Sequence, residues 1–280
     1  MAKKKPILAI SYDFDGTLAP GNMQEYYFIP AIKMTPKDFW TATKELTEKH
    51  NADPILIYMM YMLEKARNAN LPFRKRDLKN YGKSVELFEG VEGWFKRIND
   101  YGNKNGLAIE HYIISSGNKE IIEGTTIAKE FQAIYASSFV YDANDVAIWP
   151  ALAVNYTTKT QFLFRINKGV FNVYDNHTVN SYVRQEDRRV PFERMIFIGD
   201  GDTDIPSFRL VKDQGGHSIA VHKPNTKGAR KKTDSLVNAG RVNFVAPAIY
   251  SDGSEIDKIV KGIIDKIAAD IHLISLGNKG

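Results

Sequence analysis

The 280-residue sequence contains no cysteine, and this absence excludes several kinds of chemistry. A chain without cysteine forms no disulfide, binds no metal through thiolates and has no cysteine nucleophile. Long apolar runs are missing as well: the one that follows the basic residues 3–5 is short and ends at Asp13. Such a run predicts neither a signal peptide nor a membrane span. We therefore expect a cytoplasmic protein that does not bind membranes.

The excess of positive charge is small, with a formal net charge of +5. Basic residues are scattered along the chain, apart from short clusters at 3–5, 74–76 and 230–232. No zinc, RNA-binding or helix-turn-helix signature accompanies them, so we expect no nucleic-acid partner. A modest positive charge suits a small phosphorylated substrate. The length and the 43% hydrophobic content are typical of one large globular domain, or of a core domain with an insertion.

Two carboxylates follow the first apolar run of the chain. Residues 7–12 (Ile-Leu-Ala-Ile-Ser-Tyr) have the composition of a buried strand, and Asp13-Phe14-Asp15-Gly16-Thr17 comes next. Residues i and i+2 of a strand point to the same side, so Asp13 and Asp15 should converge. Two like charges that close together need a cation or a shared proton. The alternative is an Asp-Gly turn that joins two hairpin strands.

A second segment, residues 113–118, reads Ile-Ile-Ser-Ser-Gly-Asn. It predicts a strand that ends in two hydroxyl groups, from Ser115 and Ser116, before a helix begins. Backbone N–H groups at a helix start, together with a serine hydroxyl, form an anion site. The alternative is a serine that only caps the helix.

A third segment places Asp200, Asp202 and Asp204 directly after another buried strand, residues 196–198. Like charges repel, so stability does not explain three carboxylates within five positions. The spacing of an EF-hand calcium loop is missing, and oxygen ligands of this kind suit magnesium. Ligands of open parallel sheets bind at the carboxyl ends of the strands, so we expect the three segments to meet in one cleft.

The order of predicted elements is typical of an α/β protein. Residues 20–88 are helical, with helices expected at 36–50, 54–68 and 71–81, the first two capped by Thr35 and Asp53. Downstream, strands alternate with helices. The strands are expected at 112–114, within 139–156, at 195–198 and at 218–221, and the helices from residue 91, at 119–131, from residue 158 and at 254–274. This alternation predicts a doubly wound parallel sheet.

The three segments resemble motifs one, two and four of the haloacid dehalogenase-like (HAD) phosphatase superfamily, and the resemblance extends over nearly the whole chain. It implies a Rossmann-like α/β core, residues 1–19 and 89–280, with an inserted α-helical cap domain, residues 20–88. A helical cap in this place is similar to that of the phosphoserine phosphatase-like branch.

The resemblance also implies a role for each acidic residue. Asp13 would be the nucleophile that forms an aspartyl-phosphate, and Asp15 would act as general acid and then as general base. Mg²⁺ would be held by the Asp13 carboxylate, the Asp15 backbone carbonyl and Asp200. Asp204 would support this metal site, and Asp202 is a second candidate for that supporting role.

The third motif of the superfamily is a lysine at the start of a helix. Lys159 fits by position, because it heads the helix that begins at residue 158, whereas Lys168 lies at the other end of that helix. The resemblance implies that Lys159, Ser115 and the Ser116 N–H bind the phosphoryl oxygens. Four residues of the predicted cap are candidates for substrate specificity: Glu25, Tyr26, Lys33 and Arg74.

These assignments predict a magnesium-dependent phosphatase that hydrolyses a small phosphorylated metabolite, phosphoserine-like or another phosphomonoester. One alternative is a phosphotransferase or phosphomutase, which would pass the phosphoryl group to a sugar hydroxyl. Another is a non-catalytic module that binds phosphate or metal. Asp15 argues against this module, because binding alone needs no second, proton-transferring carboxylate. The sequence leaves the oligomeric state and the substrate open.

Overall fold

The computed structural model of the protein describes residues 5–277. Its centre is a seven-stranded sheet in the order β4-β3-β2-β1-β5-β6-β7. The strands are β1 (Ile7–Tyr12), β2 (Ala108–Asn118), β3 (Phe131–Tyr141), β4 (Ala147–Leu152), β5 (Met195–Gly199), β6 (His217–His222) and β7 (Phe244–Pro247). All neighbouring strands are parallel except β3 and β4. The sheet is mostly parallel and winds outward on both sides of β1, so the predicted fold class is confirmed.

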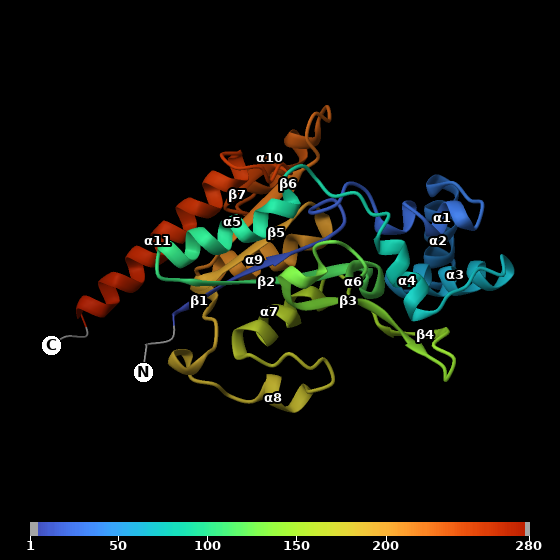
Figure 1. Ribbon diagram of the computed structural model, residues 1–280, viewed down its shortest axis with the longest axis horizontal. Coiled ribbons are helices and arrows are strands. Elements are labelled where there is room, and N and C mark those ends of the chain that lie inside the picture. Colours follow the sequence, from blue (N-terminus) through green and yellow to red (C-terminus); the bar gives the residue numbers. More distant parts are fainter. Residues whose placement is uncertain (1–4, 278–280) are drawn as a thin grey trace.

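Helices cover both faces of the sheet (Figure 1). They are α1 (Phe28–Ala31), α2 (Pro36–His50), α3 (Pro54–Asn68), α4 (Lys75–Gly82), α5 (Val91–Lys104), α6 (Lys119–Glu123), α7 (Thr158–Lys168), α8 (Asn176–Asn180), α9 (Ile205–Asp213), α10 (Ala229–Asn238) and α11 (Glu255–Gly277). Leu8 and Ile10 of β1 pack in the same cluster as α5 and α11, whereas Ala9 packs in the cluster of α7 and α9. A strand covered on both faces is mostly apolar, which explains why all six residues of β1 are buried and only Ser11 among them is polar.

The helices α1 to α4 lie between β1 and α5 in the sequence and gather at one end of the molecule, opposite the C-terminal end of α11 (Figure 1). Thr35 accepts a hydrogen bond from the Asp38 N–H, and Asp53 caps α3, as predicted. The predicted start of α4 near residue 71 is wrong, because the Phe73 carbonyl accepts a hydrogen bond from Ala147 of β4. The division into a core and a cap of residues 20–88 stays a prediction.

The helix predicted at 119–131 is also wrong, since α6 ends at Glu123 and β3 already begins at Phe131. Gly124 follows α6 and packs against α4 so closely that a Cβ atom there would lie 1.8 Å from the Lys79 carbonyl oxygen. Glycine is a poor helix former, and the two β-branched residues that follow it do not favour continuation. The sequence analysis did not identify α8, α9, α10 or β7.

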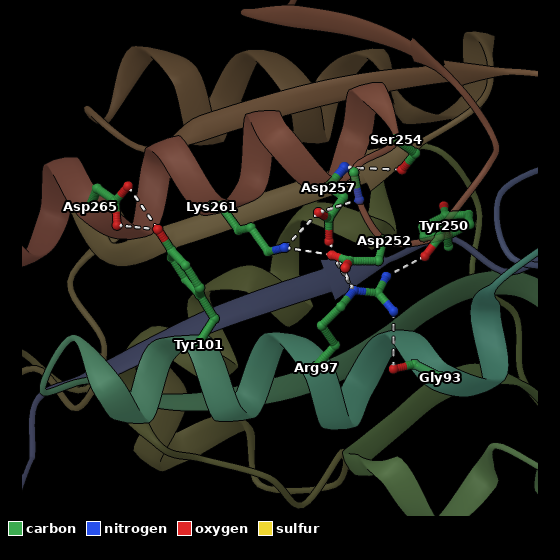
Figure 2. Close-up of polar contacts among 10 residues, drawn as sticks. Gly93, Arg97, Tyr101, Tyr250, Asp252, Ser254, Asp257, Lys261 and Asp265 are labelled. Atoms are coloured by element: carbon green, nitrogen blue, oxygen red, sulfur yellow. Dashed lines mark hydrogen bonds and ion pairs between the residues drawn. The ribbon is translucent and has the colours of Figure 1, made fainter.

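Hydrogen bonds and ion pairs connect helix α11 to α5 (Figure 2). The buried Asp257 carboxylate accepts a hydrogen bond from Arg97 Nε at 3.0 Å and pairs with Lys261 Nζ at 2.7 Å. Arg97 also donates to the Tyr250 carbonyl, and the Tyr250 hydroxyl donates to the Thr17 carbonyl at 2.9 Å. The network therefore supports the loop that follows β1. Within residues 5–277, no helix is long and apolar enough to cross a membrane.

Candidate active site

Asp13 lies at the carboxyl end of β1, with only 5% of its surface exposed. Its backbone N–H donates to the Ile198 carbonyl of β5 at 2.9 Å, which fixes the residue between two central strands. The Phe14 N–H donates to Asp13 Oδ1 at 2.7 Å. The second carboxylate oxygen, Oδ2, lies 2.9 Å from Lys159 Nζ. The carboxylate is thus held in one orientation by a backbone donor and a cation.

Lys159 is fully buried at the start of α7 and bridges two carboxylates. Its Nζ lies 2.9 Å from Asp13 Oδ2 and 2.7 Å from Asp204 Oδ1. Burial lowers the pKa of Lys159, but the two negative charges outweigh burial and raise that pKa above its ordinary value. Lys168, at the other end of α7, donates instead to the carbonyls of Val179 and Ser181 at 2.7 Å. Of the two candidate lysines, Lys159 is the one at this site.

Asp13, Asp200 and Asp204 offer carboxylate oxygens that all lie within 4.8 Å of one another. Asp204 Oδ2 accepts hydrogen bonds from the backbone N–H groups of Asp200 and Gly201 at 3.1 and 3.3 Å, while its Oδ1 faces Lys159. Three carboxylates in this arrangement could hold a divalent metal ion. Asp202, the other candidate for a supporting role, is exposed and does not belong to this group.

The electrostatics of this group fit a magnesium ion. Burial, and then the charges of Asp204 and Asp13, raise the pKa of Asp200 to about 8. Burial and the charge of Asp13 raise the pKa of Asp204 to about 6, against the opposing effect of Lys159. Carboxylates this close repel each other, and a divalent cation would relieve that repulsion. Mg²⁺ prefers such oxygen ligands, so the residues present match the predicted cofactor.

Gly16 makes room for this group. Its φ of +74° lies in the left-handed region, and a Cβ atom there would stand 2.2 Å from Asp200 Oδ2. Gly199 has a similar role beneath the other carboxylate, since its Cβ would lie 2.5 Å from Asp204 Cγ. Gly16 and Gly199 are therefore required by the close approach of the carboxylates.

The Asp15 side chain does not belong to the metal-ligating group and is oriented by the backbone of Met23. Its Oδ1 accepts a hydrogen bond from the Met23 N–H at 2.9 Å. Burial is the main cause that raises the pKa of Asp15 well above its ordinary value, and the charge of Asp13 raises it further. A raised pKa favours the protonated form of the carboxyl group, which is the form that a general acid requires.

Ser115 and Ser116 lie at the carboxyl end of β2. Ser115 Oγ accepts a hydrogen bond from the Gly117 N–H at 3.1 Å. Ser116 Oγ is buried without a hydrogen-bond partner among residues 5–277, and its carbonyl accepts from the Tyr58 hydroxyl at 2.7 Å. Because α6 has only five residues, the predicted contribution of a helix start to anion binding is weaker than expected.

The three segments line one cleft of about 600 Å³. Asp13, Asp15, Ser115, Ser116 and Asp200 all contribute to its surface. A second wall comes from the helical segment and includes Asn22, Gln24, Trp40, Ile55 and Tyr58. The cleft therefore joins the acidic loops of the sheet to the helices that follow β1.

None of the four cap residues suggested by the sequence lines this cleft. Glu25 instead accepts hydrogen bonds from the side chains of Asn22 and Trp40, both at 2.7 Å. The sequence analysis missed the residues of the helical wall, because no local pattern shows which helix face turns toward a distant loop. It also missed His222 and Lys223, which line the cleft after β6. Both residues lie at the carboxyl end of β6, where ligands of parallel sheets bind, so their position in the sequence could have identified them.

Comparison with known proteins points to one family. The model of the haloacid dehalogenase-like hydrolase family matches residues 10–209. An uncharacterized protein of Borreliella burgdorferi is 28% identical over 298 residues, which cover 97% of this chain and all of that protein.

Among solved structures, a substrate-bound phosphoserine phosphatase complex has a TM-score of 0.56 at 15% identity, with 93% of this chain and 99% of that chain covered. A HAD family hydrolase, t0658, from Salmonella enterica serovar Typhi has a TM-score of 0.55 at 16% identity, with 81% and 66% covered. At such low identity these two structures show that the fold is shared.

Proposed function

The chain belongs to the haloacid dehalogenase-like hydrolase family, and from this we propose that it is a magnesium-dependent phosphatase of a small phosphorylated metabolite. The observation that carries the proposal is the arrangement of two carboxyl groups at the end of β1. Asp13 is held by the charged Lys159 at 2.9 Å, whereas Asp15 has a raised pKa and lines the same cleft. One group is suited to nucleophilic attack and the other to proton transfer.

In the first step, the Asp13 carboxylate attacks the phosphorus of the ester. The bond from phosphorus to the leaving oxygen breaks, an aspartyl-phosphate forms, and Asp15 gives its proton to the leaving oxygen. In the second step, the ionised Asp15 takes a proton from a water molecule, which attacks the aspartyl-phosphate. Inorganic phosphate leaves, and both carboxyl groups return to their first state.

Other residues of the cleft would stabilise the transferred phosphoryl group. Lys159 orients the nucleophile, and its charge offsets the negative charge that develops on the phosphoryl oxygens. The hydroxyl of Ser116, which has no partner within the described chain, is available to donate to those oxygens. When bound to Asp13, Asp200 and Asp204, Mg²⁺ would reduce the repulsion between the carboxylates and the phosphate.

Release of phosphate tests this proposal. Purified protein is incubated with phosphorylated metabolites and p-nitrophenyl phosphate, in Mg²⁺ and in EDTA, beside the Asp13→Asn variant. We expect metal-dependent release that the variant loses. Transfer to an added sugar without release of phosphate would favour a phosphotransferase or phosphomutase. A folded protein that acts on none of these esters would contradict the proposal and favour the non-catalytic module.

A further inference from the structure

We propose that the ester cleaved here has a neutral, ring-shaped leaving group with hydroxyl groups, as in a sugar phosphate or a nucleoside monophosphate. This inference rests on the proposed function and concerns the wall of the cleft that faces the acidic loops. The wall differs from one built for phosphoserine, whose leaving group carries a carboxylate and an ammonium group.

The first argument is the shape and polarity of the helical wall. Trp40 of α2 and Tyr58 of α3 line the cleft together with Ile55, and the two aromatic rings lie 6.0 Å apart at an angle of 70°. The polar atoms of both rings are already paired: Trp40 Nε1 donates to Glu25, and the Tyr58 hydroxyl donates to the Ser116 carbonyl. These side chains can therefore offer mainly flat apolar surface, which suits the face of a ring.

The second argument is a pair of amide atoms without hydrogen-bond partners, one on Gln24, which lines the cleft, and one on Asn118, to which Gln24 is bonded. Gln24 is only 2% exposed and lines the cleft, and its Nε2 donates to Asn118 Oδ1 at 2.9 Å. Gln24 Oε1 and Asn118 Nδ2 are both buried without a hydrogen-bond partner in the described chain. The first is an acceptor and the second a donor. A single hydroxyl group can donate to the first and accept from the second, whereas phosphoserine would need its ammonium group for the first and its carboxylate for the second.

The third argument is charge. Four of the residues that line the cleft are aspartates, at positions 13, 15, 200 and 202. Among the described lining residues there is no arginine, and the one lysine, Lys223, is exposed and follows β6. No cation of the helical segment lines the cleft within residues 5–277. A carboxylate on the leaving group would thus meet the helical wall without a cation to pair with, which is costly in a partly buried site.

The experiment compares kcat/KM, in Mg²⁺, for four esters: glucose 6-phosphate, a nucleoside 5′-monophosphate, O-phosphoserine and p-nitrophenyl phosphate. We expect kcat/KM for glucose 6-phosphate or for the nucleoside monophosphate to exceed that for phosphoserine at least 100-fold. The ester with the higher kcat/KM shows whether the natural leaving group is a sugar or a nucleoside. Phosphoserine as the preferred ester would overturn the inference. Loss of all hydrolysis by folded protein would instead overturn the proposed function and the inference with it.

Two pairs of variants test the residues themselves. Gln24→Leu should lower kcat/KM for the hydroxylated ring at least 10-fold more than for p-nitrophenyl phosphate, which has no hydroxyl to place. Gln214→Leu, at an exposed position after α9, is the matched control. Equal losses for both esters would show that Gln24 only supports Asn118, and would overturn its role.

Trp40→Leu should raise KM for the ring substrate at least fivefold, because the flat surface is lost. Its control is Trp149→Leu, a 67% exposed residue of β4 outside the cleft. An unchanged KM in Trp40→Leu would contradict the stacking surface.

Discussion

Lowering the pH from 7.5 to 5 should destabilise the fold through one buried imidazole, that of His111. Trp94 Nε1 donates to the Tyr12 hydroxyl oxygen at 2.8 Å, and this hydroxyl lies 2.9 Å from His111 Nδ1. An indole only donates, so the Tyr12 proton goes to Nδ1. Nε2 then carries the imidazole proton and donates to Asn99 Oδ1 at 3.0 Å. This network holds His111 in its neutral form.

The size of the effect follows from the pKa. Burial lowers the pKa of His111 from 6.5 to about 3 in the folded protein. Below pH 6.5 the unfolded chain gains a proton that the folded chain does not, so stability falls as the pH falls and continues to fall until about pH 3. At 1.36 kcal/mol per pH unit, this residue alone lowers the free energy of unfolding by about 2 kcal/mol at pH 5.

Urea unfolding at pH 7.5 and at pH 5 measures this loss in the wild type and in His111→Gln. Glutamine can accept from Tyr12 and donate to Asn99 without titrating, so the wild type should lose about 2 kcal/mol more than the variant. All other titrating groups are common to the two proteins and cancel. His272→Gln, at an exposed position of α11, is the control and should behave as the wild type. An equal loss in wild type and His111→Gln would refute the reasoning.

Three further changes test other parts of the molecule. Lys159→Ala should lower kcat/KM more than 100-fold, while Lys168→Ala should lower it less than threefold. If phosphate-release assays give the reverse ranking, Lys168 and not Lys159 is the lysine that acts in the reaction. Gly16→Ala should raise the Mg²⁺ concentration for half-maximal activity at least tenfold, because the new Cβ would meet a carboxylate oxygen at 2.2 Å. An unchanged Mg²⁺ titration would contradict that contact. Asp257→Asn should lower the free energy of unfolding by about 2 kcal/mol, since the buried carboxylate loses its charge-assisted contacts with Arg97 and Lys261. Asp265→Asn, which alters an exposed contact, should cost less than about 1 kcal/mol, and equal losses would contradict the ranking.

Much of the fold could be predicted because its signals are local. The strand at residues 7–12 ends where its apolar run meets Asp13, and the bounds of α2 and α3 follow from the caps Thr35 and Asp53. Each of these signals lies within one or two residues of the boundary that it sets. The acidic segments could be brought together in prediction for a similar reason, because each follows a predicted buried strand.

Other features depend on contacts between distant parts of the chain. The end of α6 is set by the packing of Gly124 against the backbone of Lys79, and the start of α4 by the pairing of Phe73 with β4. The wall formed by Gln24 and Trp40 depends on how the helical segment packs over the sheet. Local sequence patterns do not show which distant segments pack together, so these features were mispredicted or missed.

The central claim is that Asp13 becomes phosphorylated, and the Asp15→Asn variant offers the most direct test. p-Nitrophenolate leaves without a proton, so this variant should still form the aspartyl-phosphate, whereas water attack lacks its base and the intermediate should accumulate. The variant is mixed with p-nitrophenyl phosphate and Mg²⁺, quenched in acid and examined by intact-mass and peptide mass spectrometry. We expect one phosphoryl group on the peptide that contains Asp13, and none when Asp13 is also changed to Asn. A phosphoryl group on another residue, or steady phosphate release by the doubly changed protein, would contradict the account.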